Sequence, residues 1–91
     1  MRLQWTASGL SDLTRLHDFL ATVNPRAAPQ IVRDLTAAAG RLPEMPRLGE
    51  ALEQFHPREV RRILVGRYEM RYELDGAVIS ILRIWHTREK R

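Results

Sequence analysis

The sequence predicts an α+β fold in which a helical hairpin packs on one face of a small, mostly antiparallel sheet. Residues 68–74 alternate strictly between apolar or aromatic and charged side chains, as in a strand with one buried face. Asp75-Gly76 follows, a dipeptide favoured in type I′ hairpin turns. Residues 78–85 are then apolar at nearly every position. Such a strand is covered on both faces, so we expect it in the middle of the sheet.

Residues 2–6 and 8–23 predict a short first strand and a first helix. The strand alternates in polarity, and Ser8 is the expected N-cap of the helix. Apolar residues recur along the helix at three- and four-residue spacing, namely Leu10, Leu13, Leu16, Leu20 and Val23. The opposite, polar side is expected to carry Asp12, Arg15 and Asp18.

Residues 25–42 predict a second helix, antiparallel to the first because the connection is short. Asn24 is a good N-cap, and Pro25 is favoured at the first helical position. The expected buried face of this helix consists of Ala28, Ile31, Val32, Leu35, Ala38 and Leu42. Prolines and a glycine then predict an irregular segment, which we expect to be attached to the core by Leu48, Leu52 and Phe55.

Three strands complete the predicted sheet, at residues 59–65, 68–74 and 77–86, with Gly66-Arg67 as the turn between the first two. The predicted order is β-α-α-β-β-β, without internal repeats. Ninety-one residues make one domain, 1–91, with a core that is only just adequate.

Composition excludes several classes of protein. There is no cysteine, so disulfides and thiolate metal sites are excluded. No apolar run approaches the roughly 20 residues that span a bilayer. The N-terminal residues lack the apolar stretch of a signal peptide. We therefore expect a cytoplasmic protein that does not engage a membrane.

The net charge of +4 is unevenly distributed along the chain. Residues 1–57 carry six basic and six acidic side chains, whereas residues 58–91 carry nine basic and five acidic ones. All but one of the fifteen basic residues are arginines, whose forked guanidinium suits carboxylate, phosphate and aromatic contacts. A basic face in the last third favours an acidic or nucleic-acid-associated partner.

Most catalytic templates are absent from the sequence. His17, His56 and His86 are isolated, and no glycine-rich phosphate loop or serine nucleophile motif is present. We therefore expect neither a metal nor a cofactor. His86 ends the most apolar strand, where it is either a proton carrier or a structural residue bonded to a nearby carbonyl or loop.

Arginines on the predicted strands have similarly open roles. Arg83 lies within an apolar strand and is expected either to pair with Glu59, Glu69 or Glu73 or to contact a target. Arg61 and Arg62 point to opposite faces of a regular strand, so only one of them can join a cationic face with Arg83. Tyr68 and Tyr72 share one face, and core packing is the first interpretation of their rings.

Several segments, in this order and spacing, resemble toxins of the ParE/RelE superfamily over residues 3–88. The matching segments are Trp5-Thr6-Ala7, Asp12-Leu13, 24–28 (Asn-Pro-Arg-Ala-Ala), 46–49 (Pro-Arg-Leu-Gly), 58–61 (Arg-Glu-Val-Arg), 68–73 (Tyr-Glu-Met-Arg-Tyr-Glu) and 81–86 (Ile-Leu-Arg-Ile-Trp-His). The resemblance implies the toxin of a type II toxin–antitoxin pair, as in plasmid stabilisation, that forms a hetero-oligomer with a cognate antitoxin. The antitoxins of such toxins are usually acidic where they bind.

Two mechanisms occur among the toxins that the chain resembles. RelE-like toxins cut mRNA on the ribosome with basic residues and often a C-terminal His or Tyr, whereas ParE-like toxins inhibit DNA gyrase. No aromatic residue follows His86, which favours the ParE-like branch. If the chain is a nuclease instead, the candidate catalytic residues are Arg61, Arg83 and His86. A third possibility is a non-toxic member that only binds its antitoxin.

We expect one surface at the end of the last strand to contact the cellular target. Its predicted members are Arg61 or Arg62, Arg83, His86 and Arg88. The strand residues would be held rigidly by the sheet, and His86 and Arg88 would extend the surface into the basic tail, 87–91.

Overall fold

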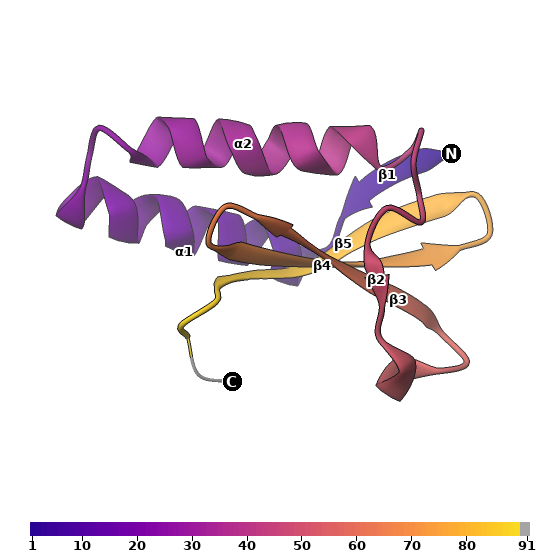
Figure 1. The fold of residues 1–91 in the computed structure, drawn as a ribbon. Coiled ribbons are helices and arrows are strands. Elements are labelled where there is room, and N and C mark those ends of the chain that lie inside the picture. Colours follow the sequence, from indigo (N-terminus) through magenta and orange to yellow (C-terminus); the bar gives the residue numbers. More distant parts are fainter. Residues whose placement is uncertain (90–91) are drawn as a thin grey trace.

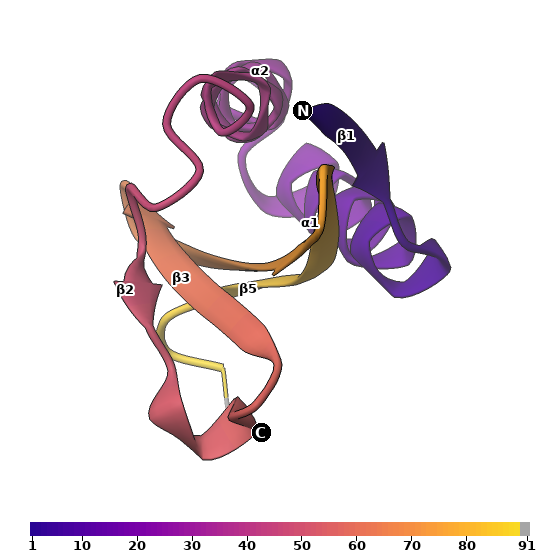
Figure 2. The ribbon, with the colours of Figure 1, turned by 90° about the vertical axis from the view of Figure 1, so that its right-hand side faces the viewer.

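Two helices lie on the same face of a five-stranded sheet in the computed structural model, which describes residues 1–89 (Figures 1 and 2). The elements are β1 (Arg2–Trp5), α1 (Ala7–Val23), α2 (Ala28–Arg41), β2 (Glu50–Ala51), the 3₁₀ helix η1 (Glu53–Phe55), β3 (Glu59–Val65), β4 (Tyr68–Asp75) and β5 (Val78–His86). The strand order is β1-β5-β4-β3-β2, with β1 parallel to β5 and every other pair antiparallel. The predicted α+β architecture is therefore confirmed.

Both predicted hairpins form, each with a two-residue loop that begins with glycine. Val65 pairs with Tyr68 and Asp75 with Val78, and Gly66 and Gly76 have φ of 59° and 61°. No non-glycine residue in the described chain has a positive φ, so these loops have the type II′ pattern. The type I′ prediction was wrong because Asp75 belongs to the strand and the loop is Gly76-Ala77.

The core lies between the helices and the sheet face that they cover. It contains the fully buried Leu35, Met70, Tyr72 and Ile81, and Tyr68 borders it. The predicted core packing of both tyrosines is confirmed. β4 is the central strand, whereas β5 was expected in that place. β5 lies next to β4 and has β1 on its other side along Val78–Ile81 only.

Helix boundaries differ from prediction at two caps. Thr6, not Ser8, caps α1: its side-chain oxygen accepts from the Gly9 N–H at 3.0 Å. Asn24 is the C-cap of α1 instead of the N-cap of α2, and residues 25–27 form a turn. α2 begins at Ala28, with Pro29 in its first turn, where a missing N–H costs nothing.

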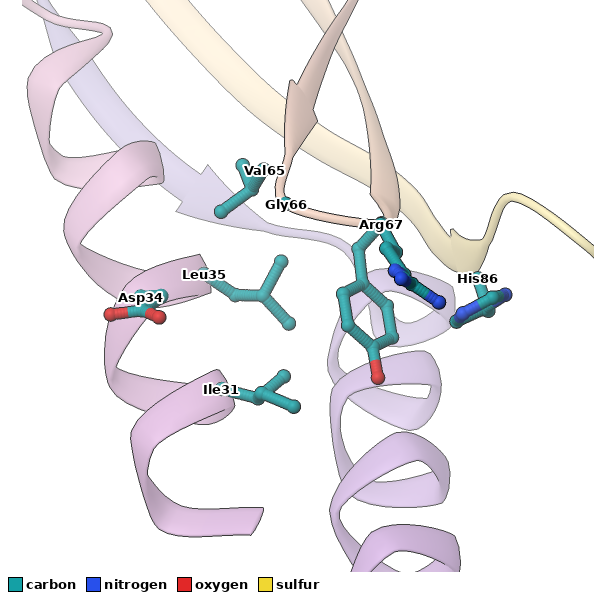
Figure 3. Close-up of a pocket in the computed structure, with 8 residues that line it drawn as sticks. Ile31, Asp34, Leu35, Val65, Gly66, Arg67 and His86 are labelled. Carbon is teal, nitrogen blue, oxygen red and sulfur yellow. The ribbon is translucent and has the colours of Figure 1, made fainter. Parts of the chain in front are cut away.

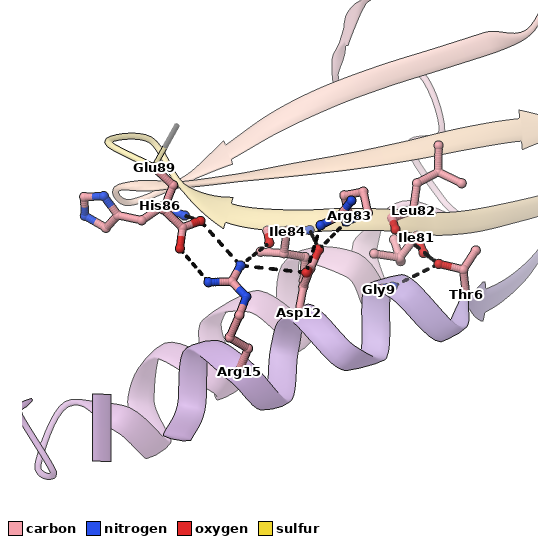
Figure 4. Close-up of polar contacts among 10 residues, drawn as sticks. All are labelled: Thr6, Gly9, Asp12, Arg15, Ile81, Leu82, Arg83, Ile84, His86 and Glu89. Atoms are coloured by element: carbon pink, nitrogen blue, oxygen red, sulfur yellow. Dashed lines mark hydrogen bonds and ion pairs between the residues drawn. The ribbon is translucent and has the colours of Figure 1, made fainter. Parts of the chain in front are cut away.

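The buried face of α1 also departs from the predicted apolar stripe. Its buried residues are Gly9, Asp12 and Leu16, whereas Leu10 and Val23 are 51% and 58% exposed. Asp12 was expected on the solvent side. It faces the sheet instead because α1 runs beside the edge of β5, where β1 has ended (Figure 4).

The segment between α2 and β3 is more ordered than its prolines suggested. β2 pairs with Arg61 and Arg62 of β3, which adds a fifth strand to the four that were predicted. Leu52 and Phe55 are partly buried as expected, whereas Leu48 is 46% exposed. Neither helix of the described residues is long and apolar enough to span a bilayer.

Candidate functional site

Three arginines form a row across the sheet face opposite α1 and α2. Arg62 of β3 pairs with Arg71 of β4, which pairs with Arg83 of β5. Directly paired residues of neighbouring strands point to the same face, so the three arginine side chains leave the sheet side by side. We call Arg62, Arg71 and Arg83 the arginine row.

Carboxylates hold each member of the arginine row in place. Arg62 donates to Glu50 at 2.7 Å and Arg71 to the buried Glu69 at 3.1 Å. Arg83 donates to Asp12 at 2.7 Å, which raises the pKa of its guanidinium. A carboxylate partner was predicted for Arg83, but Glu59, Glu69 and Glu73 were the wrong candidates, because Asp12 was assigned to the wrong side of α1.

Aromatic contacts and partial exposure complete this face. The Arg71 guanidinium lies 4.7 Å from the centre of the Trp85 ring and 5.5 Å from that of Phe55. The side chains of Arg62 and Arg83 remain 39% and 52% exposed. Each arginine of the row is thus held by a carboxylate and, for Arg71, by aromatic rings, and the two outer arginines can still contact another molecule.

Arg61 lies apart from the arginine row, on the face that the helices cover. It donates to Glu59 at 2.9 Å and to the Gly49 carbonyl at 2.7 Å. Arg47 also donates to Glu59, and the two arginines, Arg47 first, lower the pKa of that carboxyl. Arg61 therefore holds the loop before β2 against the sheet.

Tyr72 anchors the same loop from the core, which the sequence did not predict. Its hydroxyl accepts from the Gly49 N–H at 2.9 Å and donates to the Pro46 carbonyl at 2.8 Å. A Cβ at Gly49 would lie 2.6 Å from the Arg62 carbonyl and 2.9 Å from the Tyr72 ring. The Pro-Arg-Leu-Gly segment is thus a structural element that orders one end of the arginine row.

Two adjoining cavities flank His86 at the end of the sheet where β4 begins and β5 ends. Tyr68 and His86 line both of them. One, of about 260 Å³, lies between α2 and the Gly66-Arg67 turn (Figure 3). The other, of about 530 Å³, lies between α1 and the residues that follow β5. We call this pair of cavities the end groove.

One hydrogen bond and one aromatic contact fix the orientation of the His86 ring in the end groove. Its ring meets that of Tyr68 edge-on, with centroids 5.3 Å apart. Its Nδ1 accepts from the Arg88 backbone N–H at 3.1 Å, which places a ring proton on Nε2 when the ring is neutral. Within residues 1–89, no ion pair involves Arg67 or Arg88, whose guanidiniums are exposed beside the groove.

The structure brings together some of the predicted target-contact residues and separates others. Arg62 and Arg83 belong to one row, and His86 and Arg88 belong to the end groove. Arg61 aligns with Tyr72 and His86 with Tyr68. Tyr72 and Tyr68 are four residues apart on β4, so Arg61 and His86 are separated by about 13 Å along the strand direction. Lys90 and Arg91 lie outside the described residues.

The three candidate nuclease residues therefore do not converge. Arg83 points to the uncovered face, whereas Arg61 and His86 are on the covered face, aligned with Tyr72 and Tyr68, which are four residues apart on β4. General acid–base catalysis requires groups within hydrogen-bonding distance of one scissile bond. No three His, Asp or Glu side chains among residues 1–89 are placed to hold a metal ion.

Comparison with known proteins identifies the class of protein that this fold represents. The family model described as "ParE toxin of type II toxin-antitoxin system, parDE" matches residues 3–91, so the chain belongs to this family. It is a type II toxin of the ParE/RelE superfamily.

Individual relatives carry both RelE and ParE names. The chain is 37% identical over 82 residues to the toxin RelE1 of Caulobacter vibrioides, covering 88% of this chain and 86% of that one. It superposes with a TM-score of 0.79 and 25% identity on a chain of the chromosomal ParDE toxin–antitoxin system of P. aeruginosa, covering 94% of this chain and 95% of that chain. For the RelBE2 toxin–antitoxin complex of Mycobacterium tuberculosis, the TM-score is 0.60 and the identity 26%, with coverage of 93% and 88%.

Proposed function

We propose that this toxin acts in the ParE-like manner, by binding DNA gyrase through an exposed surface without catalysing a reaction. The separation of Arg61, Arg83 and His86 carries the proposal, because these are the side chains that a nuclease of this chain would use. The absence of an aromatic residue after His86 and the match to the ParE family model also support it.

The proposed gyrase-binding residues are Arg62 and Arg83 on the uncovered face of the sheet and His86 and Arg88 at the end groove, together with the tail. Arg62 and Arg83 are presented by rigid strands, and Arg88 has no ion-pair partner in the described chain. Cationic side chains on an ordered sheet favour a partner surface that carries carboxylates or phosphates.

We also propose that a cognate antitoxin covers the end groove or the open sheet edge and forms a hetero-oligomer with this chain. Both structural relatives named above are parts of toxin–antitoxin systems. Phe19 and Val23 of α1 are 61% and 58% exposed, and β2 leaves the outer edge of Ile63–Val65 uncovered in the described structure. An amphipathic, acidic segment would match these apolar and cationic surfaces.

Induction of the chain without its antitoxin tests the proposed mechanism. We expect a DNA-damage response, not codon-specific cleavage of mRNA on translating ribosomes. Deletion of residues 87–91 should abolish growth inhibition, whereas His86→Gln should reduce it only mildly. In a nuclease, His86→Gln should lower activity by about 10²–10⁴-fold, because general acid–base assistance is of that order.

A RelE-like ribosome-dependent endoribonuclease is the second candidate, favoured by the 37% identity to a protein named RelE1. Message cleavage that is lost in His86→Gln and retained in the tail deletion would establish it in place of gyrase inhibition. Absence of any growth effect, with the antitoxin still bound, would identify a non-toxic member.

Charge reversal next to the open sheet edge at Ile63–Val65 tests the proposed antitoxin surface. Arg62→Glu should slow association with the product of the neighbouring gene, and the effect should be larger at low salt. Arg61 is unsuitable for this test because it holds the Gly49 loop. A stable monomeric toxin with no affinity for that product would refute the proposed partner.

A further inference from the structure

The residues after β5 turn back on the strand instead of leaving it. The Thr87 N–H donates to the Arg67 carbonyl at 2.9 Å, and the Glu89 N–H donates to the His86 carbonyl at 2.9 Å. The Arg88 N–H donates to the His86 ring, as described above. We call residues 86–89 the tail turn.

The Glu89 carboxylate makes two contacts that hold the tail turn against α1 (Figure 4). Glu89 Oε2 accepts from the His86 backbone N–H at 3.1 Å, and Glu89 Oε1 accepts from Arg15 Nη1 at 2.5 Å. Arg15 also reaches the Ile84 carbonyl at 3.4 Å and lies 3.7 Å from Asp12. One arginine of α1 thus bridges the tail and the last strand.

We propose that Arg15 and Glu89 are positioning residues that hold the tail turn beside the end groove, so that Arg88 meets the target in a fixed place. The inference rests on the proposed function, in which the tail contacts gyrase, and it adds two residues that need not touch the target themselves.

Two observations support this assignment. Glu89 is the one acidic residue in the segment 86–91, and its carboxylate reduces the positive charge of that segment. The structure gives this carboxylate a specific partner, Arg15. Chain ends fray unless contacts hold them, and the contacts of the tail turn converge on His86, Arg67 and Arg15. Ordering the tail before binding lowers the entropic cost of binding.

Amide hydrogen exchange by NMR on the full-length toxin tests the proposal directly. Glu89→Gln and Arg15→Gln should each accelerate exchange of the Arg88 and Glu89 amides about three- to tenfold, because both partners are partly exposed and their pair is only moderately strong. The charge-swapped double variant, Arg15→Glu with Glu89→Arg, should restore part of the protection.

Arg58→Gln is the matched control. It removes the bidentate pair with Glu73, at 2.9 and 3.0 Å, which lies at the other end of β4 from the tail turn. Exchange in the tail turn and growth inhibition should match those of wild type in this variant.

Growth inhibition supplies the functional measurement. The two single variants should approach the deletion of residues 87–91, and the swap should recover part of the effect. Unchanged exchange in both single variants would overturn the positioning role of Arg15 and Glu89, as would faster exchange with full growth inhibition. If wild type itself does not inhibit growth, the proposed function fails, and the exchange comparison still decides whether Arg15 and Glu89 hold the tail.

Discussion

The two helices of the hairpin differ in what they bury. The buried residues of α2 are Ala28, Leu35, Ala38 and Ala39, all apolar. Those of α1 are a glycine, a carboxylate and a single leucine: Gly9, Asp12 and Leu16. The two helices pack side by side on one face of the sheet, so the difference does not arise from their general location (Figure 1).

The edge of β5 explains the difference. β1 pairs with Val78–Ile81 only, and from Ile81 onward the N-cap and side chains of α1 provide the hydrogen-bonding groups that a further strand would have supplied. Thr6 donates to the Ile81 carbonyl at 2.8 Å, Asp12 accepts from the Ile84 N–H at 2.8 Å, and Arg15 donates to the Ile84 carbonyl. α2 contributes apolar burial, whereas α1 also satisfies the backbone of a sheet edge.

Replacement of Asp12 should give the largest effect. Asp12→Ala leaves the Ile84 N–H and the Arg83 guanidinium without their acceptor, and should lower the free energy of unfolding by about 3 kcal/mol. Asp12→Asn keeps an acceptor and should cost about half as much. Urea unfolding monitored by tryptophan fluorescence provides the measurement.

Asp34→Ala in α2 is the control for Asp12. The Asp34 side chain is exposed and accepts from Gln30, so its loss should change the unfolding free energy by less than about 0.5 kcal/mol. Equal effects at the two positions would contradict the distinction between the helices.

The two helical glycines should respond in opposite directions to alanine. A Cβ at Gly9 would lie 2.6 Å from the Ile81 carbonyl oxygen, whereas one at Gly40 meets nothing within 4 Å. Gly9→Ala should destabilise by about 2 kcal/mol through overpacking. Gly40→Ala should stabilise by about 0.5 kcal/mol through helix propensity. Thermal unfolding curves of the two variants test this, and a stabilising Gly9→Ala would refute close approach of α1 to β5.

A smaller effect is expected from the Thr6 hydroxyl. Thr6→Val removes both the cap of α1 and the bond to Ile81, and should cost about 1–2 kcal/mol. Thr36→Val in α2 removes a bond to the carbonyl of Val32 within the same helix and should cost about 0.5 kcal/mol or less. If unfolding midpoints in urea shift equally for both variants, the edge-pairing role of Thr6 is wrong.

Local patterns were sufficient to predict most of the fold. Period-2 alternation located β4, and continuous apolar sequence located β5. The glycines at 66 and 76 marked the two turns, although the turn type required the register of Asp75 with Val78. The apolar repeat of α2 also predicted most of its buried face, namely Ala28, Leu35 and Ala38.

The candidate site was predicted less completely, because its geometry depends on the sheet. Alternation correctly separated Arg61 from Arg62, but only the register placed Arg62, Arg71 and Arg83 in one row. Nothing in the local sequence around Arg71 indicated that it belongs with them. The roles proposed for Arg62, Arg83, His86 and Arg88 remain predictions.

The sequence by itself determined the elements whose signal lies within a few residues: the four strands other than β2, the two α-helices and the positions of the two hairpin turns. Only the tertiary structure decided the partners of Asp12, Glu89 and Gly49. Asp12 bonds Arg83 and Ile84, 71 and 72 residues away, and Glu89 bonds Arg15 across 74 residues. A buried polar group needs a partner, but its own sequence neighbourhood does not specify which one, since the partner is set by where the chain returns in space.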